Sequence, residues 1–278
     1  MIGCTHAPES IGRPRSPQSD SQFRAPSSQK IDSHRNIKEV DHEKRHRADL
    51  LISVFENAST EIRYDYIENL GDGRGFTAGR AGFCSGTGDL LIVVERYASR
   101  SNDKSLTKFL PRLRVLAKQE SSSTAGLKGF ITAWKTASKN PLMHQIQDEV
   151  LDELYFAPAL RHADQIHASL ALTWVALYEA IIQHGDDDDD DSLSAIMARA
   201  TARANGSPAD GLAEEKWLEA FLEERRADLL DPSDSSTRKE WRASVGRADT
   251  MLKIFHDENF EFNGPLVVNP FGTPFELP

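Results

Sequence analysis

The sequence predicts an α+β protein that is mostly α-helical and contains one small antiparallel sheet. Two observations support this prediction. Apolar residues recur at helical spacing along most of the chain from about residue 41, whereas short alternation followed by clustered glycines occurs between residues 64 and 83. The chain shows no repeats and no marked shift in composition after its head, so residues 41–278 are predicted to form a single domain.

The head of the chain, residues 1–40, has a different composition. It is rich in Ser, Pro, Arg and Gln and shows no apolar period, which predicts disorder. A secretory signal would require a continuous apolar region, and the head contains none.

A helix is predicted from about Asp41. Leu51, Val54, Phe55 and Ala58 recur at i, i+3, i+4 and i+7 and form a stripe that would pack against a core. Glu56 lies off this stripe, so we expect it to face a cleft or solvent.

Short strands are predicted next. Tyr64, Tyr66 and Glu68 alternate with Asp65 and Ile67, and glycines follow from Gly71 onward. This pattern indicates a strand and a turn, with a small antiparallel sheet continuing through residues 81–83.

The remaining chain is predicted to be helical. Thr87 is a candidate N-cap, Pro111 a candidate kink, and the apolar run 166–177 a central buried helix joining two lobes. Further helices are expected near 192–203, 212–230 and 236–256, and irregular coil from Asn259.

The composition and net charge of the chain limit the classes of molecule that it is expected to bind. With 39% hydrophobic and 27% charged residues, the chain resembles an ordinary soluble globular protein, and it has no run of eighteen apolar residues. The net charge of −10 argues against nucleic acid or anionic lipid and fits a cationic partner, although solubility explains it equally well. Cys4 and Cys84 form no disulfide framework, and Cys84 is expected to be a small buried apolar residue.

Two carboxylates near the glycine-rich turn are candidate catalytic residues. Glu56 precedes it and Asp72 lies within Gly71-Asp72-Gly73-Arg74-Gly75. On spacing alone, a solvated glutamate at a helix end and an Asp-Gly turn are the more ordinary interpretations. The glycines follow G-x-G-x-G without a βαβ context, so a dinucleotide site is not indicated.

The ordered motifs of the chain resemble those of the glycoside hydrolase family 46 chitosanases. The resemblance runs from about residue 46 to the C-terminus, and its densest motifs are Glu56-Asn57, Tyr66-Ile67-Glu68, Gly71 to Gly75, Thr77 and Gly82 to Asp89. Sparser matches are 108–111, Trp134, 155–159, 178–181 with 184–185, 221–225 and 269–272. It implies a two-lobed lysozyme-like fold with a cleft between the lobes. It also implies endo-hydrolysis of β-1,4 links between glucosamine units with inversion.

The resemblance implies that Glu56 is the catalytic acid, Asp72 the base, and Thr77 the residue that holds the attacking water. Apolar walls would favour a protonated Glu56, whereas Arg74 beside Asp72 would keep that carboxylate ionised.

Substrate contacts are implied for Asp89, which would bind a glucosamine amine, and for the cleft-lining residues Arg74, Glu68, Tyr66 and His184. Helix capping by Asp89, tyrosine packing, a solvated Glu68 and a helix-terminal His184 are the alternatives.

A charge network supporting the base is implied for Glu179, Arg225 and Arg238. Glutamate stands at 179 where aspartate is usual in the family, and Arg226 and Arg242 are alternatives to Arg238.

No cofactor or metal is expected. The six aspartates Asp186 to Asp191 lack the pattern of a calcium loop and are expected to form a solvated, mobile loop, and no His or Cys cluster has zinc spacing. Chitosan is the expected partner of a monomer whose extracellular location is implied by the resemblance alone. A lysozyme-like muramidase and a non-catalytic chitosan-binding protein remain the alternative functions.

Overall fold

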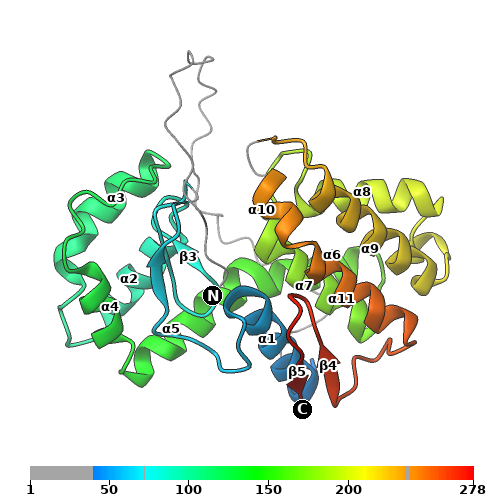
Figure 1. The fold of residues 1–278 in the computed structure, drawn as a ribbon, viewed down its shortest axis with the longest axis horizontal. Helices are drawn as coiled ribbons and strands as arrows, with labels where there is room; N and C mark the ends of the chain where they lie inside the picture. Colours follow the sequence, from blue (N-terminus) through cyan, green and yellow to red (C-terminus); the bar gives the residue numbers. More distant parts are fainter. Residues whose placement is uncertain (1–39, 72, 236–237) are drawn as a thin grey trace. The chain divides into compact units, whose positions relative to one another are not determined.

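The computed structural model describes residues 40–71, 73–235 and 238–278 (Figure 1). The predicted disorder of the head therefore concerns residues that lie almost entirely outside the described ranges, as does Asp72. The described chain confirms the predicted mostly helical α+β class.

One group of elements contains the predicted sheet and the helices around it. Strands β1, β2 and β3 form an antiparallel sheet in that order, in which Ile67 pairs with Ala78 and Thr77 with Cys84. Helix α2 packs against α3 and α5, and α4 packs against β1. The elements are α1 (His42–Asn57), β1 (Ile67–Asn69), β2 (Phe76–Ala78), β3 (Phe83–Cys84), α2 (Asp89–Arg100), η2 (Thr107–Phe109), α3 (Leu110–Lys118), α4 (Phe130–Ala137) and α5 (Pro141–Leu151).

The second group is helical and ends in a hairpin. Helix α9 packs against α8 and α11, and α6 packs against α7. Figure 1 shows these helices on the opposite side of α1 from α2, α3 and α4. The elements are η3 (Asp152–Phe156), α6 (Ala157–Gln165), α7 (Ala171–His184), α8 (Leu193–Ala204), η4 (Pro208–Asp210), α9 (Glu214–Leu230), α10 (Arg238–Ala243), α11 (Val245–His256), β4 (Leu266–Val268) and β5 (Phe275–Leu277).

The connection between the two groups differs from the prediction. Helix α5, the π-helical turn η3 and α6 follow one another without a break and lead from one group into the other. The predicted central helix begins at Ala171 rather than at 166, because α6 ends at Gln165 and His167 adopts φ +56°. Its predicted burial is confirmed, since nearly all of α7 is buried.

The start of α7 is held by a buried carboxylate. Glu214 accepts hydrogen bonds from the backbone N–H groups of Ser169 (2.7 Å) and Leu170 (3.0 Å) and from the hydroxyl of Thr173 (2.6 Å). A carboxylate at this end satisfies backbone donors and interacts favourably with the helix dipole. The partner lies 44 residues downstream of Leu170, so local sequence does not reveal it.

Three further local predictions were wrong. Helix α2 is capped by Gly88 with φ +94°, not by Thr87, and Pro111 lies in the first turn of α3, where a missing N–H costs little, instead of kinking a helix. The tail expected as coil contains the β4–β5 hairpin, in which Val268 and Leu277 are buried while Val267 is exposed. Alternate burial stabilises even such short strands.

The helix predicted for residues 236–256 divides into α10 and α11 around Ser244. Gly246 lies in the first turn of α11, where an added Cβ would lie only 1.8 Å from the carbonyl oxygen of Pro270, so the backbones approach too closely for any other residue. Among the described residues, no helix is long and apolar enough to cross a membrane.

Candidate active site

Glu56 lies in the last turn of α1 and faces the sheet. The helix ends at Ala58, which adopts a left-handed conformation with φ +48°. An idealised Cβ on Gly82 would lie 3.6 Å from Oε2 of Glu56 and 3.4 Å from Cγ2 of Thr77. Glu56 and Thr77 are therefore neighbours across Gly82, which places no Cβ between them and whose φ of +67° would strain any other residue.

The other carboxylate oxygen of Glu56 is bound by an arginine from α11. Nη1 of Arg247 donates to Oε1 of Glu56 at 2.8 Å, and the Glu56 side chain remains 24% exposed. Burial alone would lower the pKa of Arg247, but the carboxylates of Glu179 and Glu56 raise it. Arg247 thus stays charged beside an acid that solvent can still reach.

A buried line of alternating charges continues behind Arg247. Its Nε donates to Oε1 of Glu179 at 2.6 Å, and Oε2 of Glu179 lies 2.7 Å from Nη1 of Arg225. The side chains of Glu179 and Arg225 are 0% and 1% exposed. Burial lowers the pKa of Arg225 to about 10, although Glu179 opposes that shift.

The structure brings Glu179 and Arg225 together but leaves Arg238 out of this network. Arg238 pairs with Asp231 at 3.1 Å on the surface. The alternatives also point elsewhere, because Arg226 pairs with Asp249 and Arg242 donates to the carbonyl oxygen of Leu230.

Sequence reasoning missed Arg247, although the sequence contained a signal. Arg247, Met251 and Ile254 lie at i, i+4 and i+7 on the buried face of α11. An arginine on an apolar stripe is rarely buried without a charged partner, so this position indicated a buried ion pair.

Thr77 lies in the middle strand of the sheet. In the pairing register it stands between Glu68 of β1 and Cys84 of β3, so the three side chains share one face. Its Oγ1 lies 3.5 Å from Sγ of Cys84, whose thiol donates to the carbonyl oxygen of Gly82 at 3.1 Å. Cys84 is 2% exposed, in keeping with the prediction that it is buried.

The segment that contains Asp72 connects β1 to β2. Asp72 itself lies outside the described residues, while Gly71 and Gly73 on either side adopt φ +71° and +86°. Arg74 is exposed, and its carbonyl oxygen accepts from the N–H of Gly86 at 3.0 Å. The glycines are thus required by backbone conformation, and the role of Asp72 stays a prediction.

Asp89 begins α2 and is held by four hydrogen bonds. Its Oδ1 accepts from Cys84 N (2.8 Å), Leu90 N (3.0 Å) and Thr87 Oγ1 (2.6 Å), and its Oδ2 accepts from the Tyr155 hydroxyl (3.1 Å). Burial raises the pKa of Asp89, and these hydrogen bonds oppose that shift. Asp89 therefore occupies the first turn of the helix and, at the same time, presents a fixed carboxylate.

Tyr155 is a site residue to which the sequence gave no role, although it lies in a motif shared with the family. It projects from η3, a π-helical turn of the kind often found at functional sites. Burial raises its pKa well above the usual value, with further contributions from Asp89 and Glu56. The Tyr155 hydroxyl is therefore close enough to both carboxylates for their negative charges to disfavour its ionisation.

The other predicted substrate contacts divide into two kinds. Tyr66 and the exposed Glu68 lie on the sheet, where the Tyr66 hydroxyl donates to Oε2 of Glu68 at 3.3 Å. His184 is different, because its side chain is 0% exposed. Its Nδ1 lies 3.0 Å from the carbonyl oxygen of Asp191, its ring contacts Trp241, and burial lowers its pKa well below the usual value. This burial contradicts a substrate contact for His184.

The aspartate run also departs from expectation at its two ends. Asp191 is buried and accepts hydrogen bonds from Ser233 and Asp234, and Asp186 pairs with His162 and Ser194. These carboxylates anchor the loop, whereas Asp187, Asp188 and Asp190 are exposed. Among the described residues, no group of His, Cys, Asp and Glu could hold a metal ion.

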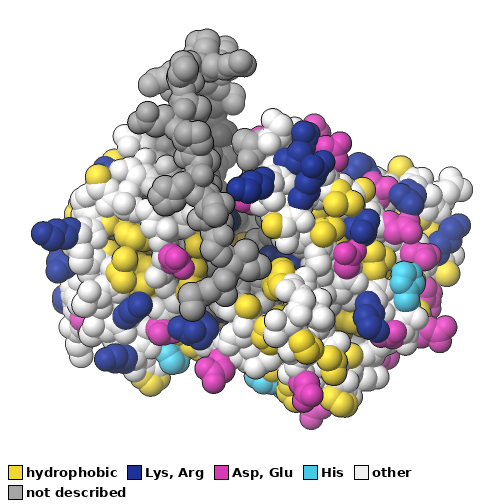
Figure 2. All heavy atoms as spheres, in the orientation of Figure 1, with side chains coloured by type: hydrophobic (Ala, Val, Ile, Leu, Met, Phe, Trp, Pro, Cys, Tyr) yellow, Lys and Arg dark blue, Asp and Glu magenta, His cyan; other side chains and the backbone are white. Residues whose placement is uncertain are grey.

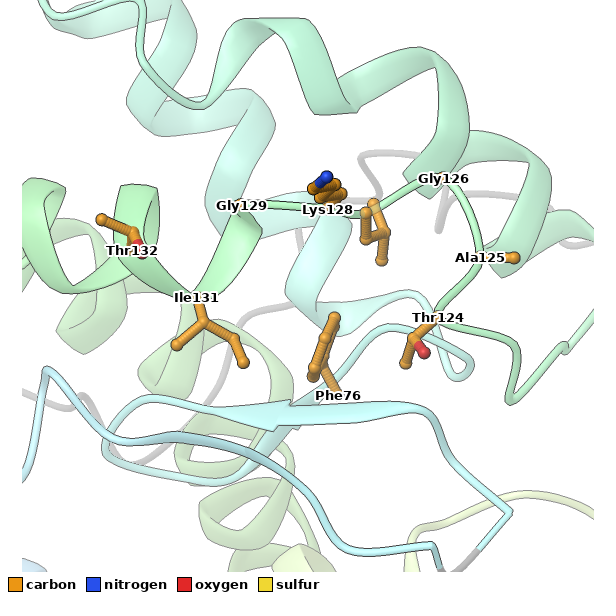
Figure 3. A pocket seen from close by; sticks show the side chains of 9 residues that line it. Phe76, Thr124, Ala125, Gly126, Lys128, Gly129, Ile131 and Thr132 are labelled. Carbon is orange, nitrogen blue, oxygen red and sulfur yellow. The ribbon is translucent and has the colours of Figure 1, made fainter.

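A separate hollow of about 590 Å³ lies beside β2 and the loop before α4 (Figure 3). Phe76 lines it together with residues 124–129, Ile131 and Thr132. Phe76 and Thr77 are adjacent in a strand, so their side chains point to opposite faces of the sheet. This hollow is therefore distinct from the space between Glu56 and Thr77.

A partly exposed carboxylate, backed by buried charges and facing a glycine-rich sheet in a largely helical fold, is suited to the general acid catalysis that glycoside hydrolases use. The model of glycosyl hydrolase family 46 matches residues 50–266, and the chain belongs to this family.

Similar proteins support this assignment. A chitosanase of Bacillus subtilis (strain 168) is 46% identical over 233 residues, which are 83% of this chain and 84% of the relative. A chitosanase of Streptomyces sp. (strain N174) is 36% identical over 230 residues, 82% of this chain and 79% of the relative.

Solved structures give the same result for the fold. The complex of a Gynuella sunshinyii family 46 chitosanase with chitotetraose matches with a TM-score of 0.83 at 46% identity, over 86% of this chain and 99% of that one. A mutant chitosanase of Bacillus subtilis MY002 in complex with six glucosamine units matches with a TM-score of 0.83 at 44% identity, over 86% and 100%. The predicted two-lobed lysozyme-like fold is confirmed.

Proposed function

We propose that the protein is an endo-chitosanase that hydrolyses β-1,4 links between glucosamine units of chitosan by a single displacement with inversion. The observation that carries the proposal is the position of Glu56, bound through Oε1 by Arg247 and directed through Oε2 toward Gly82 and Thr77. The relatives named as chitosanases and the two oligosaccharide complexes support the choice of substrate.

In this proposal Glu56 protonates the leaving glycosidic oxygen, and Asp72 takes a proton from the water that attacks the opposite face of the sugar. An inverting enzyme holds its two carboxyl groups roughly 6.5–9.5 Å apart to leave room for that water. Thr77 would bind the water through Oγ1. Its place in β2, next to Gly82 and beside Cys84, supports this role.

Asp89 would bind the ammonium group of a glucosamine unit. Three of its four hydrogen bonds fall on Oδ1, so Oδ2, which accepts from Tyr155, has the greater remaining acceptor capacity. Arg74, Glu68 and Tyr66 would line the substrate path along the sheet.

The charge of the protein supports a cationic substrate. The net charge of −10 favours a polyamine, and Figure 2 shows acidic side chains spread among basic ones over the visible face. Attraction of this kind is general rather than specific, and added salt would screen it.

The remaining expectations are that the enzyme acts as a monomer, outside the cell, and without nucleic acid or membrane partners. Gel filtration and light scattering test the first, and fractionation of the native host tests the second.

The central experiment measures the release of reducing ends from chitosan, with chitin and peptidoglycan in parallel. Wild type is expected to act on chitosan. Glu56→Gln and Asp72→Asn should each lower kcat by about 100- to 10,000-fold because each removes one proton-transfer group. Glu61→Gln is the matched control, since Glu61 is exposed and lies beyond the end of the same helix.

Failure of folded wild type to release reducing ends would favour the non-catalytic binding protein. Selective action on peptidoglycan would favour a muramidase.

A further inference from the structure

Gln183 makes two directed hydrogen bonds in the buried network behind Glu56. Its Oε1 accepts from Nη2 of Arg225 at 2.7 Å, and its Nε2 donates to Oγ of Ser244 at 2.6 Å. The same Nη2 of Arg225 donates to Oε1 of Glu179 at 2.9 Å. Gln183 and Glu179 are four residues apart on α7, so they share a face and bind the same arginine.

These contacts close a ring. Ser244 immediately precedes α11, and its carbonyl oxygen accepts from the backbone N–H of Arg247 at 2.9 Å. The ring passes from Arg247 through Glu179, Arg225, Gln183 and Ser244 and returns to the backbone of Arg247. It joins α7, α9 and the first turn of α11, and Glu56 is attached to it through Arg247.

Closure of the ring matters because arginine is long and flexible. Fixing such a side chain costs rotamer entropy, which neighbouring contacts offset by holding it in one geometry. Arg247 is held from its side chain by Glu179 and from its backbone by the turn at Ser244. Without Gln183, the second of these restraints would lose its link to Arg225.

We propose that Gln183 is a positioning residue for the catalytic acid: it ties Arg225 to the start of α11 and thereby fixes the direction from which Arg247 binds Glu56. The inference rests on the proposed role of Glu56. An amide suits the position because it accepts from Arg225 and donates to Ser244 without adding charge to a buried ion network.

The test uses Gln183→Met, which keeps the length of the side chain but makes neither hydrogen bond, and Gln183→Glu, which accepts from Arg225 but adds a negative charge. Ser244→Ala removes the contact on the other side of Gln183. Gln145→Met is the matched control, because Gln145 is an exposed glutamine on α5 whose amide bonds only Glu149 among the contacts the structure shows.

We expect Gln183→Met to lower kcat on glucosamine oligomers about tenfold, within the range found for residues that act through a network. KM should stay unchanged, because Gln183 is proposed to act through Arg225 and Ser244 rather than through the substrate. A looser Arg247 favours the protonated acid, so the basic limb of the pH–rate profile should move to higher pH. Gln183→Glu should move the limb in the same direction, and Ser244→Ala should do so by less.

A purely structural role would give a different result. If the folded Gln183 variants lose thermal stability but keep both kcat and the basic limb of wild type, the proposal is wrong. A rise in KM at unchanged kcat would also overturn it. Should Gln183→Met not fold, Gln183→Glu and Ser244→Ala decide the question. Full activity of Glu56→Gln would instead overturn the proposed function, which separates the two failures.

Discussion

Helix α1 carries a network of charges at each end, and the two networks are built differently. The network near the start, which we call the Arg45 network, contains Arg45, Asp49, Arg80, Asp148 and Asp152. The network at the end, the Glu56 network, contains Glu56, Arg247, Glu179 and Arg225. Both join segments far apart in sequence, but only the second contains a residue predicted to react.

The Arg45 network is a line of alternating charges that ends at Asp148 and Asp152, whose side chains are 42% and 38% exposed. Arg45 lies between Asp49 (3.1 Å) and Asp152 (2.7 Å), and its guanidinium stacks 3.6 Å from the centre of the Phe156 ring. Arg80 lies between Asp49 and Asp148, and the Tyr178 hydroxyl donates to Asp49 at 3.0 Å. Such an arrangement fixes α1 against η3 and α7.

The Glu56 network ends at a residue that is predicted to react. Glu179 and Arg225 are buried, and the line of charges ends at a glutamate that is 24% exposed. Because one oxygen of Glu56 is bound and the other faces Thr77, a displacement of any member behind it changes the position of the reacting group. The Arg45 network therefore contributes to stability, whereas the Glu56 network also sets the geometry of the predicted catalytic acid.

Among the residues that support Glu56 in these networks, the largest effect on activity is expected for Arg247→Met. The variant leaves Glu56 unsupported and Glu179 with Arg225 as its remaining partner among the described ion pairs. Misplacement of a reacting group by about 1 Å can cost about 100-fold, so we expect kcat/KM on chitosan to fall by about that factor.

Breaking the buried pair should also destabilise the fold by roughly 3–5 kcal/mol. Arg226→Met is the control, because Arg226 lies on α9 and pairs with Asp249 of α11 at the surface, where the two side chains are 42% and 47% exposed. A folded Arg247→Met enzyme with wild-type kcat/KM would remove the distinction between the two networks.

Arg80→Met tests the Arg45 network. It leaves Asp49 and Asp148 without the arginine that joins them, and the Arg80 side chain is only 6% exposed. We expect the free energy of unfolding in urea to fall by about 3 kcal/mol. Below the unfolding transition, kcat on chitosan should match wild type, and a large loss of kcat would show that this network also positions the site.

The same contrast explains what could be predicted from sequence. The Glu179–Arg225 pair lay within reach of motif reasoning because both residues fall in recognisable segments. Arg247 did not, since its carboxylate partners lie 68 and 191 residues away and no local pattern selects one arginine among several. The available signal was the position of Arg247 on the apolar stripe of α11, which indicated a buried ion pair.

Local periodicity predicted most of the helices correctly. It failed where contacts between distant segments determine the structure. Helices α8 and α9 match the predicted ranges closely. The start of α7 depends on Glu214, a distant carboxylate, and the β4–β5 hairpin is stabilised by burial of Leu277 against the body of the protein rather than by a strong strand signal. The resemblance assigned His184 to the substrate, whereas the structure favours the alternative, a histidine at the end of α7 whose side chain is 0% exposed.

Asp228 is a third carboxyl group to compare with those of the two networks. Its negative charge is less well compensated than theirs. Asp228 faces Arg199, but Asp189, Asp191 and Glu224 are close and His184 Nδ1 lies 3.6 Å away. Burial raises the pKa of Asp228 from 3.8 to about 7, against the effect of Arg199.

The native state therefore binds a proton at Asp228 that the unfolded chain has released between pH 4 and 7, so this group makes stability fall as pH rises through that window. Asp228→Asn should remove the dependence. Relative to wild type, the Tm of the variant is expected to improve from pH 4.5 to pH 7.5, and an unchanged difference across that range would contradict the prediction. Asp231→Asn, an exposed change nearby, is the control.

The smallest effect is expected for Arg238→Ala, which tests the arginine that sequence reasoning favoured. Arg238 and Asp231 lie 3.1 Å apart with side chains 41% and 76% exposed. Exposed pairs of this kind contribute about 0–1 kcal/mol, because solvent screens the attraction and two side chains must be ordered to form it. We expect unfolding free energy to change by less than about 1 kcal/mol and kcat/KM on chitosan to stay at the wild-type value. A loss of activity comparable to that of Arg247→Met would mean that α10 reaches the Glu56 network during catalysis, in a conformation other than the one described.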